Sequence, residues 1–287
     1  MSQPIIHTFF DEITNTATHL ILDPKKKCSA VIDSVLGFDL ESGKLNTNAA
    51  DKIIEFIKKN KLNNEWILET HIHADHLTAS SYLKKNIGGK TGISAEVKKI
   101  QEYFAPLFNI ENSIATQGTQ FDKLFTNGET FKIGSFNTLF LQTPGHTSTC
   151  STYLIEDNAF VGDALLMPDL GTGRTDFPGG SAKKLYKSIC EIFKLPAFTK
   201  IYVCHDYKNS DRNILWKCDV QEQRKKNIHV NDSISEREFI KTRTNRDKML
   251  KLPKLYLPSI QVNINAGVFP TKNKNGTAYL KIPVNTF

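Results

Sequence analysis

The sequence lacks the features that mark several classes of protein. No apolar run approaches the roughly 18–20 residues of a membrane-spanning helix, so a membrane protein is excluded. The five cysteines are irregularly spaced and form no C-x-x-C pair, which predicts a reducing compartment and no disulfide framework. The first twenty residues contain no lysine, arginine or long apolar run, so neither a secretory signal nor a transit peptide is expected. We therefore expect a cytoplasmic protein with no membrane partner.

The composition is that of an ordinary globular chain. Apolar residues make up 39% and charged residues 23% of the 287 residues, which is enough apolar material for a sizeable core. Lysine and arginine exceed aspartate and glutamate by 37 to 30, and this surplus is spread in short clusters such as 25–27. No aromatic residues alternate with a basic patch to stack single-stranded nucleic acid, so no nucleic-acid partner is expected.

Short β-type runs and amphipathic helices alternate along the first two hundred residues. The β-type runs lie at 18–22, 29–32, 66–68, 130–133, 138–141, 152–155, 159–161 and 200–204. Helical spacing of apolar residues predicts helices at 48–59, 96–104 and 181–193. Strands and helices interleaved in this way indicate an α/β layered fold.

The pattern changes after residue 205. Residues 208–250 are polar and basic and are predicted to be largely helical, with Ser235 and Glu238 as a capping box. Residues 254–287 are expected to be mixed and mostly extended, because prolines recur there. We interpret residues 1–287 as a single domain on which 208–287 packs as a C-terminal extension.

Three of the eight histidines fall within six residues. His71, His73 and His76 follow the predicted strand 66–68, and Asp75 lies between the last two. Imidazole and carboxylate together suit a divalent transition metal such as zinc or iron. This cluster is the first sign of a metal site.

Other ligand-type residues also follow predicted strands. His146 follows the run 138–141 through a short turn, Asp163 follows 159–161, and His205 follows 200–204. The ends of neighbouring strands place side chains on one rim of a sheet, where rigid elements hold them. The sequence therefore predicts that these residues meet the histidine cluster in one metal site.

The order of these motifs resembles a known family. In chain order the motifs are T-H-x-H-A-D-H, G-H-T, G-D-A and a strand that ends in histidine. Over about residues 15–206 this order is similar to that of the metallo-β-lactamase superfamily. The resemblance implies an α/β fold of the metallo-β-lactamase type: an αββα sandwich of two facing sheets with helices outside, metal at one edge, and here a C-terminal elaboration.

The local sequences resemble one branch of that family. The stretches 162–166, 173–177 and 205–207 look like those of persulfide dioxygenases, and 176–180 and 257–263 resemble the bacterial β-lactamase-hydrolase-like subgroup. Glyoxalase II, a near relative, typically has Gly-His where this chain has Ser148 and Thr149. It also has Gly-His-Glu-Tyr where this chain has His205-Asp206-Tyr207, so both departures favour the dioxygenase branch.

The branch implies one Fe(II) per chain, held by His71, His146 and Asp163. Two histidines and one carboxylate leave open positions on iron. The implied activity is oxidation of glutathione persulfide with O2 and water to sulfite and glutathione, in sulfide detoxification.

Four further residues keep an alternative open. In the dioxygenase interpretation, the following residues orient the metal ligands by hydrogen bonds: His73, Asp75, His76 and His205. In hydrolase relatives the same positions complete a two-zinc site. A hydrolase of the glyoxalase II or β-lactamase type, with one or two Zn(II), is therefore the alternative.

Other residues near the motifs have two interpretations each. Arg174 either binds a substrate carboxylate or pairs with Asp176. Tyr207 either hydrogen-bonds the substrate or packs as an ordinary tyrosine. Cys150 and Cys204 lie beside metal-type histidines, but we expect them to be small buried residues, not persulfide carriers. A homodimer is left open, because no residue pattern identifies an interface.

Overall fold

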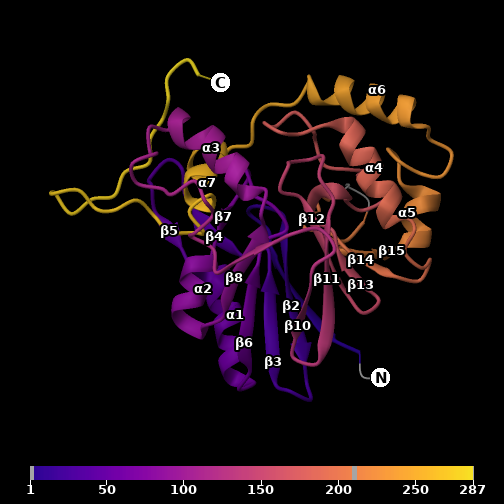
Figure 1. The fold of residues 1–287 in the computed structure, drawn as a ribbon, viewed down its shortest axis with the longest axis horizontal. Helices are drawn as coiled ribbons and strands as arrows, with labels where there is room; N and C mark the ends of the chain where they lie inside the picture. Colours follow the sequence, from indigo (N-terminus) through magenta and orange to yellow (C-terminus); the bar gives the residue numbers. More distant parts are fainter. Residues whose placement is uncertain (1–2, 209–211, 287) are drawn as a thin grey trace.

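The computed structural model describes residues 3–208 and 212–286, and two six-stranded β-sheets face each other within it (Figure 1). The first sheet has the strand order β1 (Ile5–Asp11), β2 (Thr16–Asp23), β3 (Cys28–Ile32), β6 (Asn63–Leu68), β8 (Lys90–Ser94) and β9 (Lys123–Phe125). A small third sheet consists of β5 (Leu45–Asn46), β4 (Val35–Phe38) and β7 (Leu77–Thr78). The predicted αββα sandwich is confirmed.

The second large sheet comes from the following part of the chain. Its order is β10 (Thr130–Ile133), β11 (Phe136–Gln142), β12 (Ser151–Ile155), β13 (Asn158–Phe160), β14 (Lys200–Tyr202) and β15 (Lys217–Asp219). A single 3₁₀ turn, η1 (Gly162–Ala164), follows β13. The first sheet pairs its central strands β3, β6 and β8 in parallel, so the carboxyl ends of these strands lie at the same edge.

Helices cover the outer faces of both sheets. Those near the first sheet are α1 (Asn48–Lys59), α2 (Ser80–Ile87) and α3 (Val97–Leu107), and those near the second are α4 (Ala182–Ile192), α5 (Val220–Lys226) and α6 (Glu236–Asp247). In α1, the buried Ile53, Ile54 and Ile57 repeat at helical spacing and pack on the sheet. Among the described residues, no helix is long and apolar enough to cross a membrane.

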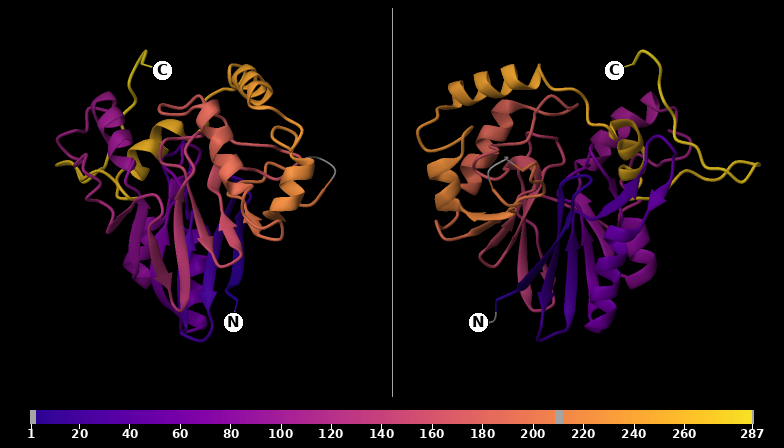
Figure 2. Two further views of the ribbon diagram at one scale, coloured as in Figure 1. Left: turned by 45° about the vertical axis from the view of Figure 1, so that its right-hand side comes forward. Right: turned by 180° about the vertical axis from the view of Figure 1, so that it is seen from behind.

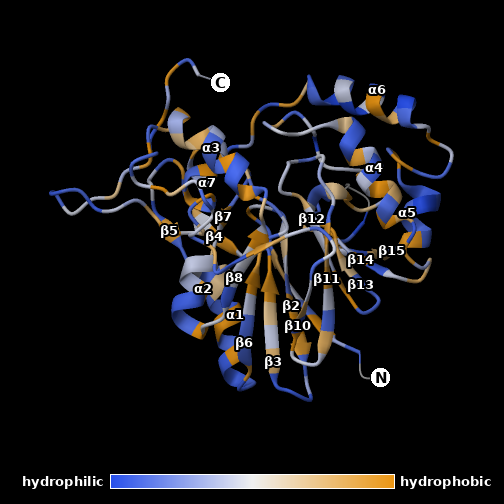
Figure 3. Ribbon diagram, viewed as in Figure 1, coloured by the Kyte–Doolittle hydropathy of each residue, from blue (hydrophilic) through white to orange (hydrophobic). Residues whose placement is uncertain are grey.

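The core between the sheets is rich in aromatic residues. Phe125, Phe140, Tyr153 and Phe160 are at most 1% exposed and belong to one cluster between the two inner faces. Figure 3 shows apolar residues concentrated on the facing strands. Each buried aromatic side chain stabilises the fold by roughly 1.5–3 kcal/mol relative to an exposed one, so the sandwich is a rigid support for the loops at its edge.

Two expectations for the C-terminal extension are wrong. Residues 256–263, expected to be extended, form the helix α7 (Tyr256–Asn263). Pro258 fits there because it lies in the first turn, where backbone N–H groups have no partner within the helix. The described part of residues 208–250 is less helical than expected, since β15 precedes α5 and a loop separates α5 from α6; residues 209–211 lie outside the described part. The predicted capping box of Ser235 and Glu238 is confirmed at the start of α6.

The extension contacts both halves of the sandwich. Helix α6 packs on α4 beside the second sheet, whereas α7 packs on β7 and α3 beside the first. Figure 2 shows α7 next to α3 when the molecule is seen from behind. Residues 250–255, which connect α6 to α7, therefore cross the edge where both sheets end.

Candidate metal centre

The structure brings all seven predicted ligand residues to one edge of the sandwich. The loop after β6 carries His71, His73, Asp75 and His76. The other three residues follow strands of the second sheet: His146 after β11, Asp163 in η1 after β13, and His205 after β14.

Three of these residues form one group. Ligand atoms of His71, His146 and Asp163 all lie within 4.8 Å of one another, and each residue is buried. The distance from His146 Nε2 to Asp163 Oδ2 is 3.6 Å. Two imidazoles and one carboxylate thus face a common point.

The other four residues form a second group beside the first. Ligand atoms of this group also lie within 4.8 Å of one another: His73, Asp75, His76 and His205. Asp163 lies between the groups, because its Oδ1 is 3.7 Å from His205 Nε2 while its Oδ2 faces His146. The arrangement has the ligands for two neighbouring metal positions.

Several of these atoms have no hydrogen-bond partner although they are buried. They are His73 Nδ1, Asp75 Oδ2, His76 Nε2, Asp163 Oδ1 and His205 Nε2. Buried polar atoms in proteins nearly always have a partner. A divalent cation among these atoms would satisfy them, so the residues fit a metal ion.

Hydrogen bonds orient two histidines of the first group. The hydroxyl of Thr70 donates to Asp33 Oδ2 at 2.9 Å, so at 3.0 Å it accepts from Nδ1–H of His71. Nδ1–H of His146 donates to the carbonyl oxygen of Arg174 at 2.6 Å. In their neutral form both rings therefore present an unprotonated Nε2, which is the form that binds a metal. Burial, aided by His73 and His146, holds the pKa of His71 well below its ordinary value.

His73 is held by two buried carboxylates. Its Nε2 is 3.0 Å from Asp33 Oδ1 and 3.3 Å from Glu69 Oε2. Burial opposes a charge on this ring, but Asp33 and Glu69 raise the pKa of His73 well above its ordinary value. Because the carboxylates of Asp33 and Glu69 occupy Nε2 of His73, Nδ1 is the atom that this ring offers to the second group of ligands.

Sequence reasoning missed three residues that support the site. Asp33 directly follows β3, so the strand-end pattern that found His205 was a signal for it as well. Thr16 lies between the rings of His76 and His205, 3.5 and 3.3 Å from their Nδ1 atoms. Asn263 of α7 contacts the histidine loop; it lies in the stretch 257–263 that carries the family resemblance, but no pattern there indicated a role at the metal site.

Arg174 and Tyr207 both line the pocket above the ligands. The guanidinium of Arg174 donates two hydrogen bonds of 2.6 Å to Asp176 and one of 2.6 Å to the carbonyl oxygen of Lys251. The ion pair with Asp176 is present in this structure, and substrate binding by Arg174 stays a prediction. Tyr207 is 48% exposed and its ring stacks on His205 at a centroid distance of 5.6 Å. Its contact with substrate stays a prediction.

The two cysteines near the site are buried. Burial raises the pKa of the Cys150 thiol to about 12, and this sulfur accepts a hydrogen bond from the Thr147 amide at 3.2 Å. Cys204 is 1% exposed, and burial raises its pKa as well. Both match the expectation of small buried residues.

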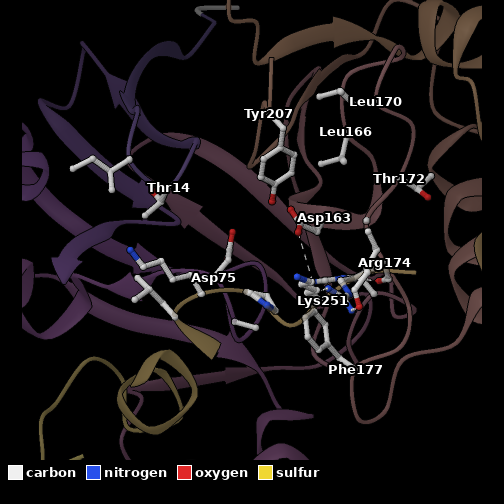
Figure 4. A pocket seen from close by; sticks show the side chains of 18 of the residues that line it. Thr14, Asp75, Asp163, Leu166, Leu170, Thr172, Arg174, Phe177, Tyr207 and Lys251 are labelled. Atoms are coloured by element: carbon white, nitrogen blue, oxygen red, sulfur yellow. Dashed lines mark hydrogen bonds and ion pairs between the residues drawn. The ribbon is translucent and has the colours of Figure 1, made fainter. Parts of the chain in front are cut away.

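A pocket of about 570 Å³ opens above the two groups of ligands (Figure 4). Asp75, His146 and Asp163 form part of its lining, and Leu166 and Phe177 supply apolar walls. The residues 250–255 form one side of the opening. Figure 4 shows the hydroxyl of Tyr207 pointing toward the side on which Asp163 lies.

Two facing sheets with seven possible metal ligands at one edge are typical of a family of metal-dependent proteins. The sequence pattern of the metallo-β-lactamase superfamily matches residues 16–205. The chain belongs to the metallo-β-lactamase superfamily, whose members depend on metal.

Individual relatives are similar to this chain over most of its length. Over 282 residues the chain is 49% identical to Glyoxylase B2 of Dictyostelium discoideum, covering 98% of this chain and 97% of that protein. It is 42% identical to the Beta-lactamase hydrolase-like protein of Xylella fastidiosa, of which it spans 65%, with 98% of this chain covered. Human mitochondrial persulfide dioxygenase ETHE1 is 31% identical over 87% of this chain and 83% of its own length.

A solved structure agrees with these relatives. The crystal structure of ETHE1 from Myxococcus xanthus superposes with a TM-score of 0.73 at 30% identity, and covers 92% of this chain and 100% of that one. The predicted relationship to persulfide dioxygenases and to β-lactamase-hydrolase-like proteins is confirmed.

Proposed function

We propose that this chain is an iron-dependent persulfide dioxygenase. It oxidises glutathione persulfide with one O2 and one water to glutathione, sulfite and two protons, so that the outer sulfur gains three oxygens. The observation that carries the proposal is the group of His71, His146 and Asp163, with their ligand atoms within 4.8 Å of one another. Two histidines and one carboxylate are typical of non-haem Fe(II) oxygenases.

The residues of this group hold a metal from one side. His71 and His146 offer their Nε2 atoms to the metal, because hydrogen bonds occupy both Nδ1 atoms. Asp163 supplies the negative charge that balances part of the charge of the cation. Bound Fe(II) would supply the redox chemistry that couples O2 to sulfur oxidation. The pocket side is left for the reactants.

The pocket suits an anionic thiol derivative. Arg246, Lys251 and Lys254 line its outer part, and their positive charges attract carboxylates such as the two of glutathione. Leu166 and Phe177, nearer the ligands, exclude water from the reacting sulfur. The persulfide end would then face Asp163 and His146.

A dinuclear hydrolase is the second candidate. Its support is the second group of ligands, in which His73, His76 and His205 each have a buried ring nitrogen without a hydrogen-bond partner. Two zinc ions at such a site generate hydroxide at neutral pH and would serve the hydrolysis of thioesters or lactams.

Oxygen uptake distinguishes the two candidates. Glutathione persulfide is added to anaerobically prepared, iron-loaded protein, and a zinc-loaded sample is run beside it. Uptake that requires iron and yields sulfite supports the dioxygenase. If protein verified to contain iron consumes no oxygen, the dioxygenase proposal is wrong. If the zinc form also holds two ions per chain and cleaves S-lactoylglutathione, the hydrolase replaces it.

A further inference from the structure

Asn263, the last residue of α7, contacts the loop that carries the histidine motif. Its side-chain N–H groups donate hydrogen bonds of 2.8 Å to the carbonyl oxygens of His73 and His76. Its side-chain oxygen accepts a hydrogen bond of 2.8 Å from the amide of Thr78. The residue is 2% exposed, so all three bonds lie in a low-dielectric interior where losing one is costly.

The loop has little other backbone support at this end. Residues 69–76 form neither helix nor strand, and backbone hydrogen bonds to Gly92 and Ser151 hold only the first two of them. At its beginning, Asp33 accepts a hydrogen bond of 2.7 Å from the amide of Thr70. Asn263 performs the same task at its other end. Between these ends, the hydroxyl of Thr149 accepts a hydrogen bond of 3.1 Å from the amide of Ile72. Asn263 is thus the side chain that holds the end of the loop with His73 and His76.

Helix α7 also reaches His146, through the ring of Phe177. The ring of Tyr256 stacks on Phe177 with a centroid distance of 5.7 Å and an interplanar angle of 13°. Phe177 in turn meets His146 edge-on at 5.3 Å. One helix of the C-terminal extension therefore contacts the loop of His73 and His76 directly and His146 through Phe177.

We propose that Asn263 is a positioning residue of the metal centre. It sets the spacing of His73 and His76 through their carbonyl groups, and so the direction of both rings toward a metal. The superfamily pattern ends at residue 205, so the site of this chain is completed by a side chain outside that range. The inference rests on metal binding at the proposed site and is independent of persulfide oxidation.

Three variants test the inference with Co(II) alone as the probe. Asn263→Asp keeps the size of the side chain but replaces its two N–H groups with an oxygen that faces two carbonyls. Asn263→Ala removes the bonds without adding charge. Asn265→Asp is the matched control, because among residues 3–208 and 212–286 the Asn265 side chain bonds the carbonyl of Val268 and makes no hydrogen bond to a ligand loop. Co(II) is titrated into each metal-free protein, and visible absorption reports the coordination geometry.

Both Asn263 variants are expected to bind Co(II) about 10–100-fold more weakly and with an altered visible spectrum, while the control matches the parent. Far-UV circular dichroism and thermal melting of the metal-free proteins check that all variants are folded. Parent-like affinity and spectrum in both Asn263 variants would overturn the inference. So would loss of the fold in both, since Asn263 would then be a folding residue. An inactive parent that binds Co(II) normally contradicts only the dioxygenase proposal.

Discussion

The ring of His146 is bonded to the backbone of Arg174, with Nδ1–H donating to the carbonyl oxygen at 2.6 Å. The segment around that carbonyl is itself anchored. The next residue, Thr175, donates from its amide and its hydroxyl to Asp247 of α6 at 2.9 and 2.8 Å. The side chain of Arg174 pairs with Asp176. The direction in which His146 presents Nε2 therefore depends on contacts made by the C-terminal extension.

Replacing a residue of the first ligand group should remove the metal. In His146→Ala, iron and activity are expected to disappear together, because one of three ligands is lost. Metal content by mass spectrometry and oxygen uptake measure both. His7→Ala, which changes an exposed histidine of β1, is the control. Full iron occupancy in His146→Ala would show that this residue is no ligand.

The second ligand group should respond differently. His73→Ala is expected to retain one iron per chain with altered activity, because the first group is intact and His73 only supports it. Metal analysis after iron loading and after zinc loading measures this. If the parent binds two metals per chain and His73→Ala loses one of them, the dinuclear hydrolase is favoured.

Asp33 should influence metal binding without touching the metal. In Asp33→Asn, the acceptor for His73 and for the amide of Thr70 is weakened. Metal affinity is expected to fall by about 10–100-fold, as for other residues that orient metal ligands. A competition titration with a chelator measures the change. Asp157→Asn, at an exposed position, should bind as the parent does.

The basic side of the pocket should affect substrate binding more than chemistry. In Lys254→Ala, the KM for glutathione persulfide is expected to rise several-fold and kcat to change little, because an exposed ion pair contributes about 0.2–1 kcal/mol. The effect should shrink as salt is added. Lys183→Ala on α4 is the control at an exposed lysine outside the pocket. A fall in kcat at constant KM would contradict this role.

Acid should destabilise the protein partly through His19. Burial lowers the pKa of this 1%-exposed residue to about 4, and the neutral ring bonds Thr8 and the carbonyl of Val203. The unfolded chain takes up a proton near pH 6.5, before the folded chain does. The stabilisation is therefore complete above pH 6.5 and falls by about 2 kcal/mol by pH 5.

Urea unfolding of the parent and of His19→Gln at several pH values between pH 6.5 and pH 5 measures the contribution of His19 to the free energy of unfolding. The variant is expected to be less stable at neutral pH but to lose less stability on acidification. Parallel pH profiles for the two proteins would show that His19 does not titrate in this way.

The sequence by itself determined the elements with a clear local pattern and the order of the ligands. The helix at 48–59 and the strand at 130–133 match α1 and β10, because apolar spacing marks them within a few residues. It also placed each metal-type residue after a strand. In the second sheet β11, β13 and β14 run in the same direction, so the residues that follow them meet at one edge.

Only the tertiary structure decided what the C-terminal extension does. Helix α7 shows no apolar face in its sequence, because polar Ser259, Gln261 and Asn263 are buried along with its apolar residues. The bonds from Asn263 to His73 and His76 join residues 187–190 positions apart. Local patterns carry no information on such pairs, since only the packing of α7 against β7 brings the amide to the carbonyls that it bonds.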